Sequence, residues 1–394
     1  MRNNQKIPEG WSVKKLGDIG KVSMCKRIMK HETNPDKGIP FYKIGTFGGK
    51  PDAYISSELY LSYKNKYSYP KKGDILISAA GTIGRTVIFD GADAYFQDSN
   101  IVWISNDETK ALNRYLLYYY TTSPWYTTTG GAISRLYNEN ISNAKIVLPP
   151  LPEQEKIAGI LGTWDEAIEK LSSLIEQKKL LKRGLMQRLL TGKTRLPTFT
   201  QPWKEVKLSD FLKEHTEKTT KNDQYQVLSV TKNGICSQEE YFEKQIASEN
   251  NIGYKILRKH DIVFSPMNLW MGSIGFSEYD IGIVSPAYKI FTVNENVALF
   301  SFLKHFMIIN RMIYLYLINS EQGASIVRRN LDLDGLLSSK VSIPDISEQQ
   351  AIADVLSTAD DEINLLNKKL EALKEQKKGL MQQLLTGQTR VKVN

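Results

Sequence analysis

The side chains best suited to chemistry in this 394-residue chain are polar and basic groups in loops between β-rich runs. Arg and Lys can donate to the acceptors of guanine, Asn and Gln can pair with adenine, and all four can contact phosphate. The first half of the chain offers Lys43, Thr46, Lys50, Arg85, Gln97, Asn100, Arg135 and Asn138. The second half offers Thr231, Lys232, Asn233, Asn268, Trp270, Arg328 and Arg329. Because a surface Arg or Lys is usually only solvated, each residue taken alone is a weak candidate for contact with DNA.

A nucleotide-binding loop is the first enzymatic alternative, at Gly192-Lys193-Thr194. Such a loop needs a glycine five residues before Gly192, where Gln187 stands. The matching stretch later in the chain has Gln388 in place of the lysine, which a nucleotide site could not lose. We therefore interpret Gly192 and Gly387 as C-terminal caps of helices.

Other catalytic patterns are also missing from the sequence. It contains no Asn or Asp followed by two prolines and an aromatic residue, the tetrapeptide of adenine methyltransferases, and no nuclease-like carboxylate cluster stands out. The four histidines are scattered, and Cys25 and Cys236 have no second Cys or His at ligand spacing. We expect no catalytic residue, metal or bound cofactor in this chain, and a reducing cytoplasmic setting in which disulfides do not form.

The residues that would position these side chains are arranged as one unit repeated twice. Residues 153–192 and 348–387 align without a gap, and roughly half of the aligned positions are identical. The preceding segments correspond more weakly: Trp11, Leu16 and Asp18 match Trp203, Leu208 and Asp210, Gly81-Thr82-Ile83-Gly84 matches Gly272-Ser273-Ile274-Gly275, and Leu148-Pro149 matches Ile343-Pro344. Similar helices with divergent domains indicate one scaffold with two specificities.

Each closely matched segment predicts a long helix with a coiled-coil seam, because apolar residues recur at alternating spacings of three and four. The first seam is Leu161, Trp164, Ile168, Leu171, Ile175, Leu185 and Leu189. The second is Leu356, Ala359, Ile363, Leu366, Leu370, Leu373, Leu380 and Leu384. Lys182 and Lys377 occupy matching seam positions, and we expect their stems along the seam with the ammonium groups in water.

The charges of the two helices predict how they pair. Acidic residues gather early in each helix, as at Asp165 and Asp360, and basic residues gather late, as at Lys178 and Lys374. This distribution suits the dipole of each helix taken alone. Only an antiparallel pair also places acid beside base, so we predict an antiparallel coiled coil with pseudo-twofold symmetry.

Residues 11–148 and 203–343 are predicted to be mixed α/β domains, because short β-rich runs alternate with Gly, Ser and Asn. Helices are expected near Tyr115–Tyr120 and from Ala298 to Ile318. The latter contains charged residues, which favours a buried amphipathic helix over a membrane span. We place the boundaries at residues 1–150, 151–197, 198–345 and 346–394, as domain, helix, domain and helix.

Composition is compatible with a nucleic-acid partner. Lys and Arg number 52 against 43 Asp and Glu, which gives a formal charge of +9. A modest basic excess suits a polyanion. The hydrophobic fraction of 41% and the charged fraction of 24% are typical of a globular protein. The first ten residues are polar, so they do not form a signal peptide.

The chain resembles the specificity subunits of type I restriction-modification systems over essentially its whole length. The resemblance rests on Trp11 with Leu16-Gly17-Asp18, on the Gly81–Gly84 turn, and on Leu148-Pro149-Pro150-Leu151-Pro152-Glu153-Gln154 running into Ile157. Its most specific part is Gly184-Leu185-Met186-Gln187-Arg188-Leu189-Leu190-Thr191-Gly192, with its second copy.

The resemblance implies an α/β (α+β) protein with two target-recognition domains in tandem, separated by two long helices. Each domain would read half of a split, asymmetric site in double-stranded DNA. The helices would dock two modification methyltransferase subunits, which bring S-adenosylmethionine, and restriction motor subunits could join. The setting would be the cytoplasm of a bacterium or archaeon. A stand-alone nuclease or methyltransferase, and a purely architectural coiled coil, are the alternatives.

Overall fold

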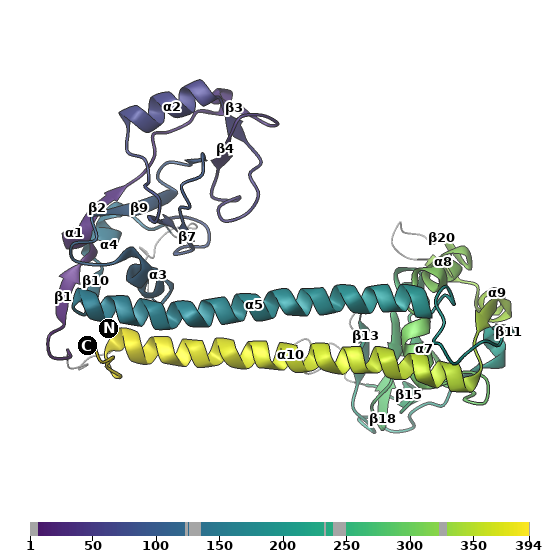
Figure 1. Cartoon of the computed structure of the whole chain (residues 1–394). Coiled ribbons are helices and arrows are strands. Elements are labelled where there is room, and N and C mark those ends of the chain that lie inside the picture. The colour runs from purple at the N-terminus through teal and green to yellow at the C-terminus, as the bar shows by residue number, and fades with distance from the viewer. Residues whose placement is uncertain are drawn as a thin grey trace. The chain divides into compact units, whose positions relative to one another are not determined.

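The computed structural model describes residues 7–122, 125, 135–231, 234–238, 250–322 and 329–393. The chain folds into two compact units. Unit 1 comprises Met1–Leu171 and Lys369–Asn394, and unit 2 comprises Ser172–Lys368. Each unit therefore combines one mixed α/β domain with one end of each long helix, as the labels in Figure 1 allow the reader to follow.

Unit 1 contains two four-stranded sheets. The first has the antiparallel order β2-β9-β6-β7, and the second has the order β3-β5-β4-β8, in which β4 and β8 are parallel. A separate pair, β1 and β10, joins the start of the domain to its end. The strands are β1 (Ser12–Lys15), β2 (Gly20–Ser23), β3 (Thr33–Asn34), β4 (Ile39–Tyr42), β5 (Tyr54–Ile55), β6 (Ile75–Ser78), β7 (Thr86–Ile88), β8 (Tyr95–Phe96), β9 (Ile101–Asn106) and β10 (Lys145–Leu148).

Short helices cover these sheets. The Ser56 hydroxyl caps the N-terminus of α2 (Ser57–Lys66) by accepting a hydrogen bond from the Leu59 amide. The helices of this domain are α1 (Leu16–Ile19), the 3-10 turn η1 (Lys30–Glu32), α2 (Ser57–Lys66), α3 (Asn113–Thr122) and α4 (Asn138–Asn143).

Unit 2 repeats the first of these sheets and the β1–β10 pair, while its other strands form the two-stranded pairs β13-β14, β15-β18 and β20-β21. Its four-stranded antiparallel sheet has the order β12-β19-β16-β17, and β11 pairs with β22 as β1 pairs with β10. The strands are β11 (Lys204–Lys207), β12 (Leu212–His215), β13 (Leu228–Thr231), β14 (Gly234–Ser237), β15 (Lys255–Arg258), β16 (Ile262–Phe264), β17 (Ile274–Phe276), β18 (Ile281–Val284), β19 (Lys289–Val293), β20 (Ser320–Gln322), β21 (Arg329–Leu331) and β22 (Lys340–Ile343). The same sheet order in both units confirms the tandem α/β fold that the sequence repeat predicts.

The helix expected from Ala298 to Ile318 is two helices, α7 (Phe300–Phe306) and α8 (Asn310–Ile318). The backbone of Ile309 is extended at the break. The carbonyl of Met307 accepts a 2.9 Å hydrogen bond from the buried Tyr316 hydroxyl. No Pro or Gly marks this break, so the apolar run could not reveal it. The described part of the domain also contains two 3-10 turns, η2 (Leu208–Asp210) and η3 (Leu269–Met271), and helix α9 (Leu333–Ser338).

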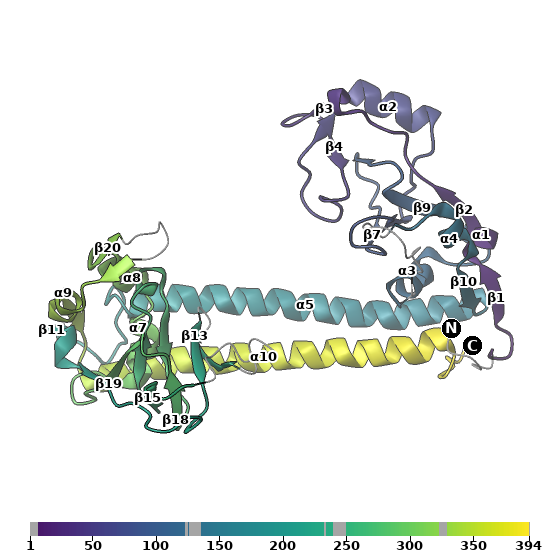
Figure 2. The ribbon, with the colours of Figure 1, turned by 180° about the vertical axis from the view of Figure 1, so that it is seen from behind.

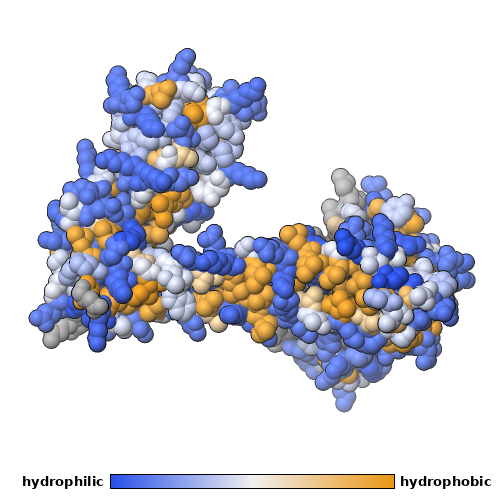
Figure 3. Space-filling view, in the orientation of Figure 1, coloured by the Kyte–Doolittle hydropathy of each residue, from blue (hydrophilic) through white to orange (hydrophobic). Residues whose placement is uncertain are grey.

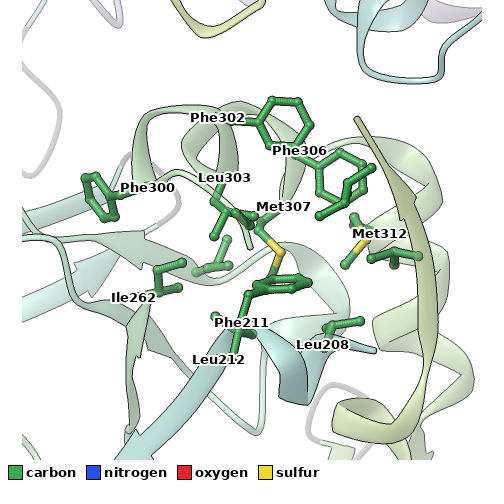
Figure 4. Close-up of a cluster of buried hydrophobic side chains, with 14 of the residues drawn as sticks. Leu208, Phe211, Leu212, Ile262, Phe300, Phe302, Leu303, Phe306, Met307 and Met312 are labelled. Carbon is green, nitrogen blue, oxygen red and sulfur yellow. The ribbon is translucent and has the colours of Figure 1, made fainter. Parts of the chain in front are cut away.

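Each domain buries aromatic and aliphatic side chains between its sheets and helices. In Figure 4, Met307, the residue that follows α7, lies against Phe211, which belongs to the same buried cluster of unit 2. The ends of the long helices enter these cores: Leu189 and Leu356 in unit 2, and Leu161 and Leu384 in unit 1. The helix ends are therefore part of the domains and do not only link them.

The long helices are α5 (Leu151–Leu189) and α10 (Ile346–Thr386). At 1.5 Å per residue, the 39 residues of α5 extend about 58 Å. Within each unit the start of one helix lies beside the end of the other, an antiparallel arrangement visible in Figures 1 and 2. All fifteen expected seam residues are buried or half-buried. No helix in the described part of the chain is both long and apolar enough to span a membrane.

Candidate nucleic-acid interface

The first domain brings several of the predicted residues into one polar pocket of about 630 Å³. Lys43, Gln97, Asn100 and Arg135 line it together with Arg27, Lys30 and Asn34, which sequence reasoning missed. Two carboxylates, Asp52 and Asp98, lie among its cationic side chains. Apolar residues such as Phe41 also line the pocket, but its many side-chain donors suit base edges and phosphates better than a small apolar ligand.

A tight turn after β4 positions Lys43. The Thr46 amide donates to the Lys43 carbonyl at 3.0 Å, and the Thr46 hydroxyl accepts from the Lys43 amide at 3.1 Å. Thr46 therefore acts within the turn. The Lys43 ammonium pairs with Asp52 at 2.8 Å, and both side chains are substantially exposed. Lys43 can reach a ligand by exchanging one exposed partner for another, at small cost.

The loop between β8 and β9 is held at several points. The Gln97 side-chain oxygen accepts from the Ile44 amide at 2.9 Å. Because a carbonyl oxygen has two lone pairs, Gln97 can hold this backbone amide and still accept from a base, so its pairing with adenine stays a prediction. The Asn100 backbone is fixed by the Ala79 amide, which donates to its carbonyl at 2.8 Å.

Two arginines from other segments of the chain donate hydrogen bonds to this β8–β9 loop. Arg135 donates from a terminal nitrogen to the Ser99 carbonyl at 3.0 Å. Arg27 donates through Nε to Asp98 at 2.7 Å. Cys25, close in sequence to Arg27, is buried, and burial raises the pKa of its thiol to about 12. The thiol is therefore protonated at neutral pH and is no nucleophile.

The remaining candidates of the first domain lie apart from the pocket lining. Arg85 is exposed and donates to the Phe47 carbonyl at 3.0 Å, beside the Gly81–Gly84 turn. Gly81 and Gly84 both have positive φ, +64° and +80°, which explains glycine there. Lys50 is exposed, and Asn138 is the exposed first residue of α4.

In the second domain, Asn268, Trp270 and Arg329 come together around η3. The Arg329 guanidinium lies 5.1 Å from the Trp270 ring centroid, and the Arg329 amide donates to the Met267 carbonyl. The Trp270 indole nitrogen and Arg329 Nε are buried donors with no hydrogen-bond acceptor among the described residues. This group is therefore rich in donors, like the first-domain pocket.

Thr231 does not join that group. It ends β13, and its hydroxyl donates to the Gly234 carbonyl at 3.0 Å within the β13–β14 hairpin. Lys232, Asn233 and Arg328 lie outside the described residues.

A buried joint fixes each domain to the helices. In unit 1, Glu153 accepts from the Trp11 indole at 2.9 Å and from two nitrogens of Arg390. In unit 2, Glu348 accepts in the same way from Trp203 at 3.2 Å and from Arg195. Gly387 and Gly192 have φ of +71° and +68° and lie under these indoles, as expected of helix caps.

A second joint corrects the expectation for two seam lysines. The ammonium groups of Lys377 and Lys182 do not end in water: they pair with Asp165 and Asp360 on the antiparallel helix. Both lysine side chains are less than one-fifth exposed. Water solvates a partly buried ammonium group poorly. A carboxylate on the facing helix therefore stabilises each ammonium group better than the remaining water contacts would.

No metal site is found in the described residues, where no group of three or more His, Cys, Asp or Glu could hold an ion. The chemistry that these side chains can perform is hydrogen bonding and charge pairing with a polar, anionic ligand.

Comparison with known proteins agrees with this inventory. Residues 8–177 and 200–375 match the model of a family described as type I restriction modification DNA specificity domain. A putative type I restriction enzyme specificity subunit of Haemophilus influenzae is 59% identical over 177 residues, 44% of this chain and 46% of that protein. The alignment thus spans less than half of that relative. The putative MjaX specificity subunit of Methanocaldococcus jannaschii is 26% identical, covering 98% of this chain and 95% of its own.

Solved structures share the fold. An S subunit of a type I restriction-modification system from M. genitalium has a TM-score of 0.58 at 14% identity, covering 98% of both chains. A chain from a study of complex assembly and conformational transition of the type I R-M system has a TM-score of 0.55 at 12% identity, covering 97% of this chain and 99% of that one. At such identities the likeness concerns the fold alone.

Proposed function

Because the chain belongs to the type I restriction-modification DNA specificity family, as its two matched domains establish, we propose that it reads a bipartite, asymmetric DNA site, one domain for each half. In this family the chain is the DNA-recognition component and not the catalyst. The observation that carries the proposal is the repeat: both units share sheet order and helix joints but differ in their polar loops. One scaffold with two unlike surfaces suits two unlike half-sites.

The working modules are residues 1–150 and 198–345 as target-recognition domains and residues 151–197 and 346–394 as helical spacers. The joints at Glu153 and Glu348 support this division, because each anchors a domain to a helix through buried hydrogen bonds. The sequence-predicted DNA residues fall on the domains and the seam residues on the spacers. DNA contacts by the basic side chains would weaken with salt.

The helices are the proposed docking surface for two modification methyltransferase subunits. Leu174, Leu180, Leu181 and Leu365 are exposed on α5 and α10, Leu365 by 67%. The face drawn in Figure 3 shows apolar surface over the helices. Exposed leucines in a water-soluble coil indicate a surface that a partner covers. Leu181→Glu should abolish co-purification of the methyltransferase without altering the thermal unfolding of this chain.

The chemistry belongs to those partners. S-adenosylmethionine would bind to the methyltransferase subunits, restriction motor subunits could join, and the assembly would act on double-stranded DNA in the cytoplasm of a bacterium or archaeon. Relatives from both groups of organisms support that setting.

The test is methylation by the purified partner with and without this chain. Adenine methylation at a bipartite motif should require the chain. Replacing residues 11–148 with the corresponding domain of another family member should then change one half of the motif and leave the other half intact. If the partner alone methylates the same sites, or the replacement alters both halves, the proposal is wrong.

A further inference from the structure

Arg27 is a largely exposed cation of the first-domain pocket and yet it is oriented. Its side chain is 64% exposed, and its Nε donates to Asp98 at 2.7 Å. Neither terminal nitrogen of Arg27 has a hydrogen-bond partner in the described part of the chain. An arginine whose inner N–H is already held has less rotational freedom to lose when its outer edge binds a ligand.

Asp98 is itself well fixed. Its side chain is only 17% exposed, and its carbonyl accepts from the Asn100 amide at 2.6 Å across a three-residue turn. Ser99 at the centre of that turn has φ of +53°, an uncommon value for a residue with a side chain. Arg135 donates a hydrogen bond to the Ser99 carbonyl, and the Gln97 side chain accepts one from the Ile44 amide. Backbone strain that is held at this many points is typical of functional loops.

The free edge of Arg27 has a specific complement. Its two terminal nitrogens are parallel donors, and guanine presents two neighbouring acceptors, O6 and N7, in the major groove. Adenine offers one acceptor beside a donor, so it would leave one N–H facing another. A phosphate could also accept from this edge, but loss of a phosphate contact weakens binding to every sequence alike, whereas loss of a guanine contact relaxes one base pair.

We propose, resting on the proposed function, that Arg27 reads a guanine in the half-site of the first domain, with Asp98 as its positioning residue. Arg27→Lys keeps the charge and removes the bidentate edge. Loss of one bidentate contact should lower discrimination at that base pair roughly 5- to 150-fold, the equivalent of about 1–3 kcal/mol.

The experiment maps methylated adenines in cells that express the methyltransferase with wild-type chain, R27K, R27A, D98N or the control K72A. Lys72 is exposed in the same domain and does not line the pocket. R27K and R27A should make one guanine of one half-site degenerate, D98N should relax the same position partially, and K72A should leave the motif unchanged. A merely structural role for Asp98 would lower methylation everywhere without changing the motif.

The outcomes separate this inference from the proposed function. A wild-type motif that is not bipartite, or that appears without the chain, would overturn the proposed function. A bipartite wild-type motif that R27K leaves intact would overturn the Arg27 inference alone. If a variant abolishes methylation, the affinity of the R27K protein is measured for a duplex with the specific site and for a non-specific duplex. A ratio of specific to non-specific affinity below that of wild type supports base reading by Arg27. A ratio equal to that of wild type refutes it.

Discussion

Trp11 and Glu153 lie 142 residues apart in the chain and share a buried hydrogen bond of 2.9 Å. The same carboxylate accepts two further bonds from Arg390, near the end of the chain, so one residue ties together three distant segments of unit 1. Trp203, Glu348 and Arg195 repeat the arrangement in unit 2. The two joints are therefore part of the repeated scaffold, and the polar loops are where the units differ.

Removing the Glu153 carboxylate should destabilise unit 1. Burial alone raises the pKa of Glu153, but the hydrogen bonds from Arg390 and Trp11 outweigh it and hold the pKa below its ordinary value. Glu153→Ala should lower the free energy of unfolding by about 2–3 kcal/mol, since hydrogen bonds to charged groups are lost and a buried indole donor is left unpaired. Chemical denaturation at neutral pH measures the change.

The pH dependence gives the control for that prediction. A carboxyl with a depressed folded pKa stabilises the fold above its ordinary value of 4.5 and loses that effect as pH falls through the folded value. Glu153→Gln should therefore remove part of the acid destabilisation seen below pH 4.5. Glu166→Gln, in an exposed pair with Lys170 on the same helix, should not. Equal acid profiles for wild type and E153Q would contradict the role of Glu153.

His305 should make unit 2 sensitive to mild acid. It is buried on α7 against Lys182 and Asp360, and burial, with the charge of Lys182, lowers its pKa from 6.5 to about 4. Because the unfolded chain then binds the proton more readily, stability is full above pH 6.5 and falls between pH 6.5 and about 4. The corresponding position in unit 1 is Tyr118, whose hydroxyl donates to Asp165 at 2.7 Å.

The tyrosine at the corresponding position of unit 1 suggests the variant that tests the acid sensitivity of unit 2. His305→Tyr should reduce the loss of stability between pH 6.5 and 4 and leave stability at pH 7 similar, because Tyr can offer its hydroxyl to Asp360. Unfolding free energies at pH 7 and pH 5 would check it. A loss of the same size in wild type and H305Y would assign the acid sensitivity to other groups.

The parts of the fold that the sequence predicts are those encoded locally. Apolar spacing predicts α5 and α10, and Gly192 and Gly387 mark their ends because a left-handed residue closes a helix. The repeat predicts that both domains share a fold. The sheet order β2-β9-β6-β7 is not encoded in this way, since it depends on pairing between strands far apart in the chain.

The site was predictable only in part for the same reason. Lys43, Asn100 and Arg135 are recognisable as polar loop residues, and they do meet in one pocket. Arg27 lies in no turn motif, and its importance depends on Asp98, 71 residues away. Gln97 is also recognisable as a polar loop residue, but its hydrogen bond with the Ile44 amide, 53 residues away, depends on the tertiary fold. Residue type can be read from sequence, but the atoms left free by tertiary contacts cannot.

Charge reversal across the helices should show pairwise coupling. Asp165→Lys or Lys377→Asp alone would place like charges together at a half-buried position, and each should cost about 1–3 kcal/mol of unfolding free energy. The double variant D165K/K377D should recover most of the loss. Reversal of the exposed Glu166–Lys170 pair should change stability by less than about 0.5 kcal/mol. Additive costs in the double variant would mean that Asp165 and Lys377 do not interact.

A chain of residues 1–197 should form a homodimer. In the whole protein the core of unit 1 takes Met381, Leu384 and Leu385 from α10, and a lone first half lacks them. It does contain their repeat equivalents Met186, Leu189 and Leu190, which a second copy can supply in antiparallel register. Dimerisation therefore buries apolar surface that a monomer would expose.

The same register brings Asp165 of one copy to Lys182 of the other, so each charge pair forms twice. Light scattering should give a dimer for residues 1–197 and a weakened dimer for the D165K variant, restored in D165K/K182D. With the methyltransferase, that dimer should modify a palindromic site built from the first half of the wild-type motif. A stable, folded monomer would show that the helix joints are not interchangeable between the two repeats.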